Sequence, residues 1–440
     1  MTMTAFFASF LFWAGAVQDG PENDSLRRLI RDLEHDDVAV RERAERDLEA
    51  AGEAAAPALR RLLENSQGTQ NELTLRATAV LRRIERAAKI RAAYRDPAPL
   101  RLDVRDADLR AALAEIERQA GVRFEDPPRD VAARITLAAD GRPLLAVLDD
   151  LSRRAGISYQ WKDDRTIRLL PEPLPPYPAA YPGPFAVRVV ELRLERRTDF
   201  KERTARVRLQ LETDYERSLK PLGFPSVTLR EARDDRGSAL EVREGVEDVE
   251  SPLAAVRVLV RPAARGLGAS PERRAFALSG LALGAGKISL QGTVRALFPL
   301  ESGEIRLKPE AGAQAEAGQV RIRVERATAG RLWMLTFAPA DGTPDESFLE
   351  TVAERLDEES LVAVDDQGAE HKGTFVRTPE AAAVVAVRNA RKVPADPVRA
   401  VYQAAFPALG PRAVREIRFR FVTDTYVKEM PFALEGVELP

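Results

Sequence analysis

From Phe185 to the end of the chain, apolar residues recur at every second position in a series of short segments. The clearest segments are Val190/Leu192/Leu194, Val207/Leu209/Leu211, Val256/Val258/Val260, Ile288/Leu290, Ile305/Leu307, Val320/Ile322/Val324, Trp333/Leu335/Phe337 and Ile417/Phe419/Phe421. A period of two is that of a strand with one buried face and one solvated face. Many short strands of this kind, separated by turn residues, predict antiparallel β-sandwich structure over this half of the chain.

A weak internal repeat runs through the same region. The stretch VTLREARDDRGSAL (227–240) parallels SLVAVDDQGAEHKG (360–373), and each places Asp-Asp-x-Gly where a hairpin turn is expected. Likewise ISLQGTVRALFPLESGEIRL (288–307) parallels IRFRFVTDTYVKEMPFALEGVEL (417–439). We therefore predict two related β-sandwich domains, 185–310 and 318–440, the second with one helix near 346–356. A single larger sandwich is the alternative.

Residues 98–171 have a different pattern, which predicts the order β-α-β-β-α-β-β. Apolar residues alternate in LRLDV (100–104), and two amphipathic helical patterns follow, each ended by a glycine, Gly121 and Gly156. A hairpin turns at Asp163-Asp164 and returns through Ile167 and Leu169. Two helices on one side of a small mixed sheet are the expected packing.

The segments LRLDVRDADLRAALAEIERQAGVRF and ARITLAADGRPLLAVLDDLSRRAGISYQWKDDRTIRL resemble the secretin and TonB short N-terminal domain over roughly seventy residues. In that family the domain is a periplasmic docking unit that couples a larger machine to a partner protein. Neither the secretin pore domain nor an outer-membrane barrel pattern follows here, so transport does not carry over from the resemblance. The rest of the chain resembles exported bacterial β-sandwich proteins of unknown function.

Residues 23–96 are predicted to be helical, because apolar residues recur at i, i+3, i+4 and i+7. The string DDVAVRERAERDLEAAGEAAAPALRRLL resembles a HEAT-type repeat, with one clear copy and about half of another. Solenoids usually need three or more repeats, so we expect a short helical array. Residues 172–184, rich in proline, are predicted to form a semi-rigid linker. The fold class expected overall is therefore multidomain α+β: helical array, small βαββαββ domain, then two β-sandwiches.

The first 17 residues resemble a signal peptide, with an apolar run from Ala5 to Val17. Ala14 and Ala16 fit the small-x-small pattern that precedes cleavage, and the apolar run is shorter than the ~20 residues of a spanning helix. No Lys or Arg precedes the run, so a misassigned start and an uncleaved anchor stay open as alternatives. We expect export to the periplasm or cell envelope, with no membrane span after signal removal.

Composition excludes several classes of function. The formal net charge is −2, with acids interleaved among the arginines, which argues against a nucleic-acid binder. There is no cysteine, so disulfides, thiolate metal sites and a cysteine nucleophile are all absent. The two histidines, His35 and His371, have no evident partners in sequence for a metal site or a catalytic triad.

The remaining motifs are better explained by structure than by chemistry. The three Asp-Asp turns lack the spacing of a calcium loop, and turn chemistry accounts for each residue in them. The stretch GLALGAGKI (280–288) departs from the phosphate-loop spacing and lacks its Ser/Thr. We expect no catalytic residues, no cofactor and no metal.

The function expected is therefore that of a non-enzymatic, exported envelope protein that docks or scaffolds protein partners. The predicted contact is an exposed edge strand to which a partner adds a strand; its residues are Arg165, Thr166, Ile167, Arg168 and Leu169. A structural or matrix spacer is the alternative, followed by an unrecognised hydrolase in one of the sandwiches.

Overall fold

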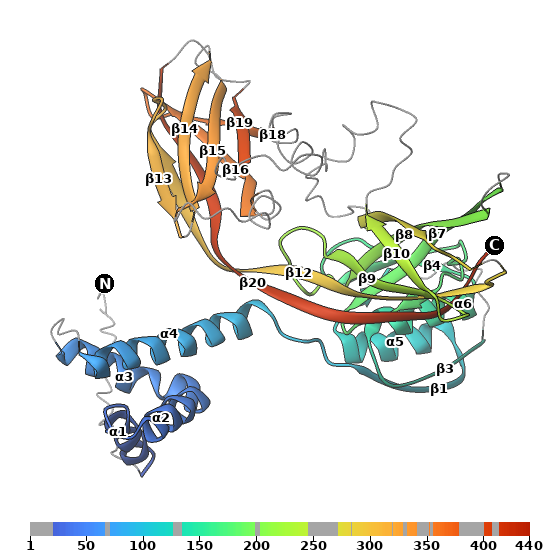
Figure 1. Cartoon of the computed structure of the whole chain (residues 1–440), viewed down its shortest axis with the longest axis horizontal. Coiled ribbons are helices and arrows are strands. Elements are labelled where there is room, and N and C mark those ends of the chain that lie inside the picture. Colours follow the sequence, from blue (N-terminus) through green and yellow to red (C-terminus); the bar gives the residue numbers. More distant parts are fainter. Residues whose placement is uncertain are drawn as a thin grey trace, which may run out of the picture. The chain divides into compact units, whose positions relative to one another are not determined.

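The computed structural model describes residues 21–66, 71–125, 134–198, 203–244, 272–282, 284–318, 320–328, 332–340, 352, 355–377, 400–406 and 413–440. It is mostly β, with six α-helices among these residues and several sheets, two of them large and sandwich-like (Figure 1). The chain divides into two compact units, Met1–Ala92 and Ala93–Pro440. The predicted signal peptide, with Ala14 and Ala16, lies outside the described residues.

The first unit is helical, as its apolar periodicity predicts. Its elements are α1 (Pro21–Asp32), α2 (Val38–Ala51), the short 3-10 helix Gly52–Ala54, α3 (Ala56–Asn65) and α4 (Glu72–Ala93). Asp37 caps α2, because its carboxylate accepts a hydrogen bond of 2.9 Å from the Ala39 N–H. Gly52 ends the same helix with a φ of 59°, which favours glycine. The core is made by the side chains that define the predicted helical faces, among them Leu48, Leu59 and Val80.

The next region has the predicted order of strands and helices. It consists of β1 (Leu100–Asp108), α5 (Leu109–Ala120), β2 (Arg123–Phe124), β3 (Arg134–Arg142), α6 (Leu144–Ala155), β4 (Ser158–Trp161) and β5 (Thr166–Leu170). Asp108 caps α5 through the Ala111 N–H at 2.8 Å, and Gly121 and Gly156 end the two helices in the left-handed conformation. The strands form two small sheets, β1–β3 and β2–β5–β4, where one mixed sheet was predicted.

Part of the proline-rich segment belongs to a sheet. Within residues 172–184, β6 (Ala179–Ala180) pairs with the following strand β7, and the Leu174 N–H donates to the Ile157 carbonyl at 3.1 Å. This segment therefore lies along its neighbours through backbone hydrogen bonds.

The strand-rich half contains β7 to β20 in two large sheets. Their bounds are β7 (Phe185–Thr198), β8 (Arg203–Tyr215), β9 (Ser226–Asp234), β10 (Ala239–Glu244), β11 (Glu272–Ser279), β12 (Lys287–Leu307), β13 (Gln314–Ala317), β14 (Val320–Thr328), β15 (Leu332–Pro339), β16 (Leu356–Asp365), β17 (Glu370–Lys372), β18 (Thr374–Arg377), β19 (Ala400–Ala405) and β20 (Val414–Glu438). The ten-stranded sheet has the order β17-β16-β20-β12-β9-β10-β11-β8-β7-β6, and the five-stranded sheet has the order β13-β14-β15-β19-β18.

A similar order of antiparallel pairings occurs twice along the chain, except that β10 pairs with both β9 and β11, whereas β17 and β18 lie in different sheets. The first set runs β6–β7–β8–β11–β10–β9–β12, and the second runs β13–β14–β15–β19–β18, then β17–β16–β20. The two Asp-Asp-x-Gly turns occupy equivalent places, joining β9 to β10 and β16 to β17. Asp234 receives the N–H groups of Arg236 and Ser238, and Asp365 receives those of Gln367 and Ala369; all four distances lie between 2.8 and 3.0 Å.

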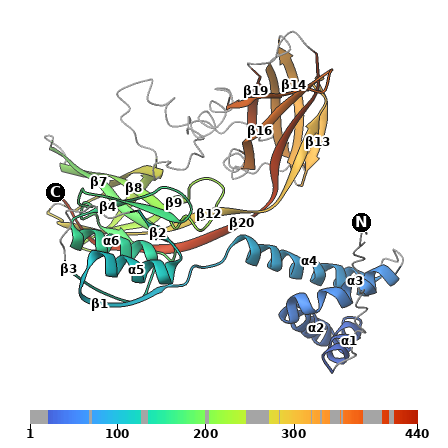
Figure 2. The same ribbon diagram turned by 180° about the vertical axis from the view of Figure 1, so that it is seen from behind.

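The long strands β12 and β20 connect the two sets. They pair antiparallel from Lys287 opposite Glu438 to Leu307 opposite Ile417, and both views show them side by side along this length (Figures 1 and 2). We call the two cores that they join the first and the second β core. The first takes Ile288 from β12 and Phe432 from β20, and the second takes Leu307 and Ile417. Each core is thus completed by the end of a strand from the other set, and the domain bounds 185–310 and 318–440 stay a prediction.

Candidate functional site

The predicted edge strand lies in the middle of its sheet. β5 pairs in parallel with β2 on one side and antiparallel with β4 on the other. The Arg165 carbonyl accepts from the Arg123 N–H at 2.7 Å, and the Ile167 carbonyl accepts from the Glu125 N–H at 2.9 Å. The position was wrong because β2, only two residues long, returns beside β5 after helix α5. Whether Arg165–Leu169 binds a partner stays untested.

Arg168 of that strand has an ion-pair partner. The Arg168 guanidinium donates to Glu125 at 2.7 Å, and Lys162 also contacts this carboxylate. The side chains of Ile167 and Leu169 are buried in the core of the small α/β region. The strand is therefore built as an interior element of its sheet.

A buried ion cluster joins the small α/β region to the first β core, and the sequence analysis did not predict it. Asp149 of α6 and Arg188 of β7 are 1% and 5% exposed. Arg188 donates Nε to Oδ2 and Nη2 to Oδ1 of Asp149, both at 2.9 Å. Such a planar two-pronged pair fixes both the distance and the orientation of the two elements.

Two tyrosines complete the hydrogen bonding of Asp149. The Tyr159 hydroxyl donates to Oδ1 at 2.7 Å, and the Tyr181 hydroxyl donates to Oδ2 at 2.6 Å. Burial, together with the neighbouring carboxylate, raises the pKa of both phenols. On the far side of Arg188, Asp214 of β8 lies 3.7 Å from Nη1. Burial opposes the charge of Arg188, but Tyr159 and Asp149 outweigh this effect and raise the pKa of the guanidinium. The hydrogen bonds and ion pairs of Asp149 and Arg188 are therefore made among members of the cluster.

A second contact holds the N-terminus of α6. Pro143 occupies the N-cap position and offers no side-chain acceptor, so the first N–H groups of the helix need a partner from elsewhere. Glu216, which follows β8 and is 5% exposed, lies beside the Leu144 N–H at the start of the helix. Burial raises the pKa of this carboxyl to about 7, although the Leu144 N–H acts in the opposite direction. This buried carboxyl is thus a second point at which α6 meets the segment that follows β8.

Helix α6 has almost no solvent-exposed face as a result. Eight of its residues are buried: Leu144, Leu145, Ala146, Val147, Leu148, Asp149, Leu151 and Ser152. The amphipathic pattern predicted only the side that faces the small core, where Leu144, Val147, Leu148 and Leu151 lie. A signal for the second contact was present in the sequence, since Arg188 interrupts the apolar run FAVRVV. A charge at the centre of such a strand requires a buried partner.

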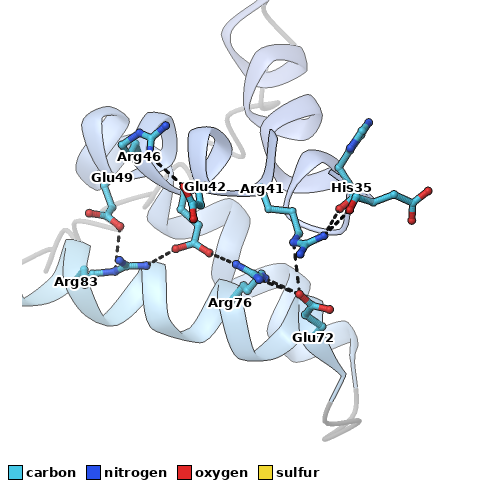
Figure 3. A network of polar contacts seen from close by, with 10 residues as sticks. His35, Arg41, Glu42, Arg46, Glu49, Glu72, Arg76 and Arg83 are labelled. Carbon is cyan, nitrogen blue, oxygen red and sulfur yellow. Dashed lines mark hydrogen bonds and ion pairs between the residues drawn. The ribbon is translucent and has the colours of Figure 1, made fainter. Parts of the chain in front are cut away.

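The helical unit carries a network of charges of its own (Figure 3). Glu45 lies between Arg76 and Arg83, at 2.6 and 2.8 Å, and Arg83 also contacts Glu49 at 2.9 Å. Burial opposes the charge of Glu45, but its hydrogen bonds with Arg83 and Arg76 outweigh burial and lower its pKa. Arg41 donates to the carbonyls of His35 and Asp36 at 2.6 and 3.0 Å. The network joins α2 to α4, and within it His35 provides a backbone carbonyl that accepts from Arg41.

The other candidate groups also have structural partners. His371 Nε2 lies 3.0 Å from Asp365 Oδ2, beside the hairpin turn that Asp365 caps. Across the described parts of the chain, no three His, Cys, Asp or Glu residues are grouped as a metal site. Nor does any described helix combine the length and the apolar character needed to cross a membrane. The buried cluster between α6 and β7 has the geometry of a joint between two elements.

Comparison with known proteins gives no family for this chain. No protein-family model matches it, and no curated protein matches it. A solved structure described as BspA_C_WT is 10% identical, covers 60% of this chain and 87% of its own, and has a TM-score of 0.09. A TM-score this low carries no information on fold or function.

Proposed function

We propose that this protein is a non-enzymatic scaffold of the bacterial cell envelope, exported through its N-terminal apolar segment, which docks a protein partner. The observation that carries the proposal is the attachment of α6 to β7 through the two-pronged pair of Asp149 and Arg188. This attachment makes the small α/β region a rigid platform on the first β core. A rigid platform suits recognition of a partner, because little conformational entropy is lost on binding.

The finer architecture belongs to the same proposal. Residues 98–171 would be a domain like the secretin and TonB short N-terminal domain, residues 23–96 a HEAT-like array, and residues 185–310 and 318–440 two sandwiches. The resemblance of residues 98–171 supplies the docking role. The outward side of the β1–β3 sheet, with exposed residues such as Asp103 and Ala138, is available for contact.

Within the described parts of the chain, the buried carboxylates have structural roles that fit a scaffold. The buried carboxylates Asp149, Asp234 and Asp365 each accept hydrogen bonds from named neighbours and have structural roles in a joint or a turn. The grooves lined by Arg306, Lys308 and Glu416, and by Tyr181, Pro182 and Phe432, bring together no nucleophile and base.

A spacer role is the second candidate, and the long strands favour it. Because β12 and β20 pass through both β cores, the connection between the cores is a paired ribbon. Such a connection could hold two modules at a fixed separation in a wall or matrix.

Site-specific photo-crosslinking in cells separates the two candidates. A photoreactive residue at Ala138, on the β1–β3 sheet, should give one dominant cross-link to another envelope protein. The same residue at Arg243, exposed on β10, is the matched control and should not give that product. Cross-links only to further copies of this chain would favour the spacer role, and no cross-link at either site would contradict docking through this sheet.

Export is tested independently of partner binding. Replacing Ala14 and Ala16 by arginine should leave a precursor that is longer by the uncleaved segment, as measured by mass spectrometry of fractionated cells. If the natural chain stays in the cytoplasm with an intact N-terminus, the proposed envelope location is contradicted.

A further inference from the structure

The two sets of strands place an arginine at the same position of each sheet. Arg188 lies opposite Ala179 of the edge strand β6 and opposite Glu212 of β8. Arg321 lies opposite Glu316 of the edge strand β13 and opposite Ala338 of β15. Their apolar neighbours, Val187 and Val189 in one strand and Val320 and Ile322 in the other, enter the first and second β core. Both arginines therefore point away from the core of their own sheet.

A second register leads to the same equivalence. In the first set, β11 pairs with β8 and places Phe276 opposite Leu209. In the second set, β19 pairs with β15 and places Tyr402 opposite Leu335. Glu212, the residue opposite Arg188, lies three positions after Leu209 in β8. Ala338, the residue opposite Arg321, lies three positions after Leu335 in β15.

The two equivalent surfaces differ in what covers them. Around Arg188 the surface is occupied by α6, and the arginine side chain is 6% exposed. Around Arg321 the side chain is 45% exposed, although it contacts Glu316 at 3.4 Å and the Ala340 carbonyl at 2.8 Å. The Glu316 side chain is itself 63% exposed, and an ion pair this exposed is weak enough to be exchanged for another.

The charges also differ, in a direction that selects the occupant. On the first surface β8 supplies Glu212 and Asp214 beside Arg188, whereas the equivalent positions are Ala338 of β15 and Ala340 just after this strand. Arg323, which is exposed, lies opposite Thr336, whereas the residue opposite the equivalent Gln210 of β8 is Glu191. The second surface therefore has an arginine in place of a glutamate and lacks the two carboxylates of β8. Its own carboxylates are Glu316, on the edge strand where β6 has Ala179, and Glu325, which accepts from the Thr336 hydroxyl at 3.0 Å.

We infer that the outward face of β14 and β15, around Arg321 and Arg323, is a docking surface for a partner helix that presents a carboxylate, as α6 presents Asp149 to Arg188. The inference rests on the proposed scaffold function and names the surface and the chemistry of its partner. Three features support this occupant: the surface equivalent to it holds such a helix in the same chain, its arginines lack carboxylates from β15, and small alanines leave room for a helix to approach.

The test uses the full chain and a helical peptide as the probe. The peptide has the sequence of residues 143–156, PLLAVLDDLSRRAG, with a side-chain staple because a helix this short is marginal alone. Binding should slow hydrogen exchange in β14 and β15, and Arg321→Glu should weaken it by about tenfold or more, as expected for loss of a desolvated charge partner. Arg243→Glu, the same change at an exposed arginine of β10, should leave the affinity unchanged.

A charge exchange guards against effects on folding. A peptide carrying Asp149→Arg should bind poorly to the natural chain and should regain affinity for the Arg321→Asp chain. Protection confined to β7 and β8, or absence of binding, would overturn the inference. Stronger Arg321-dependent binding to phosphatidylglycerol vesicles than to the peptide would overturn it in favour of a lipid surface.

The experiments distinguish failure of the proposed function from failure of the inference about Arg321. If the Ala138 cross-link to an envelope protein forms equally in the natural chain and the Arg321→Glu chain, while the peptide does not bind, then docking stands and this surface is not used. Loss of the Ala138 cross-link in the natural chain would remove the scaffold proposal itself.

Discussion

Asp149 and Arg188 form a two-pronged ion pair, with both nitrogen–oxygen distances at 2.9 Å, between a helix of the small α/β region and a strand of the first β core. Both residues are almost fully withdrawn from solvent. Desolvating two charges costs several kcal/mol each, and the cost is offset only when the geometry and the remaining hydrogen bonds are nearly complete. Tyr159 and Tyr181 supply those hydrogen bonds on the Asp149 side.

Removing either partner of this pair should be strongly destabilising. Asp149→Ala and Arg188→Ala should each lower the free energy of unfolding by about 3–5 kcal/mol, because each leaves an uncompensated buried charge. The double variant Asp149→Leu/Arg188→Met should cost clearly less than the sum of the two, since no charge remains. Urea denaturation with hydrogen exchange of the α6 amides measures both effects. Arg154→Ala, which removes an exposed partner of Asp150, is the control, with a cost of at most about 1 kcal/mol.

The buried Glu216 should make stability depend on pH. Its folded-state pKa is raised to about 7 from 4.5, so the folded state holds the proton more tightly than the unfolded chain. Ionising Glu216 lowers the free energy of unfolding. This loss of stability is absent below about pH 4.5, grows as the pH rises towards 7, and stays constant above pH 7. Its full size is on the order of 3 kcal/mol.

Glu216→Gln should remove this dependence while keeping a side chain of the same size and an oxygen beside the Leu144 N–H. The variant should match the natural chain near pH 4.5 and be more stable than it at pH 8, as measured by urea denaturation across this range. Glu216→Ala, which removes most of a buried side chain, should be less stable than Glu216→Gln at every pH. Equal pH dependence in the natural chain and the Gln variant would contradict the assignment to this carboxyl.

The local features of the fold could be predicted from the sequence. The helix ends at Gly121 and Gly156, the turns at Asp234 and Asp365, and the alternating strands each depend on residues within a few positions of one another. The weak repeat was also informative, because the paralleled segments fall on equivalent strands. Periodicity and turn chemistry are local signals, and these elements follow from them directly.

What could not be predicted were contacts between residues far apart in the chain. Alternation in β12 and β20 identifies strands but does not say that each strand enters both cores. The two residues of β2 are too few to form a pattern, and so β5 was placed at an edge. Asp149 and Arg188 pair α6 with β7, and the local pattern of neither segment indicates that it contacts the other.

The two hairpin carboxylates should make similar contributions, because each accepts two turn N–H groups and has a further partner, the Ala282 N–H at 3.0 Å for Asp234 and His371 for Asp365. Asp234→Ala and Asp365→Ala each remove these contacts at a buried position, and each should cost about 1–3 kcal/mol. Asparagine at either position keeps one oxygen acceptor and should cost less. The control is Asp163→Ala in a more exposed turn, where solvent can replace the lost acceptor. Denaturation midpoints that separate Asp234 from Asp365 would contradict the equivalence of the two turns.

Gly292 of β12 should be the least replaceable glycine of the first β core, since it lies directly opposite Phe432 of β20. A Cβ atom there would lie 2.4 Å from the Thr228 carbonyl oxygen and 2.7 Å from the Phe432 ring, so backbone of β9 and the ring of β20 would both have to move. Gly292→Ala should lower the free energy of unfolding by about 3 kcal/mol, at the upper end for overpacking by one methyl group. Gly303→Ala in the same strand is the matched control, because its nearest neighbour would be the Thr423 methyl at 3.7 Å, an ordinary contact. Urea denaturation should therefore separate the two variants by at least about 2 kcal/mol, and equal midpoints would mean that β9 and β20 are not packed against β12 as closely as described here.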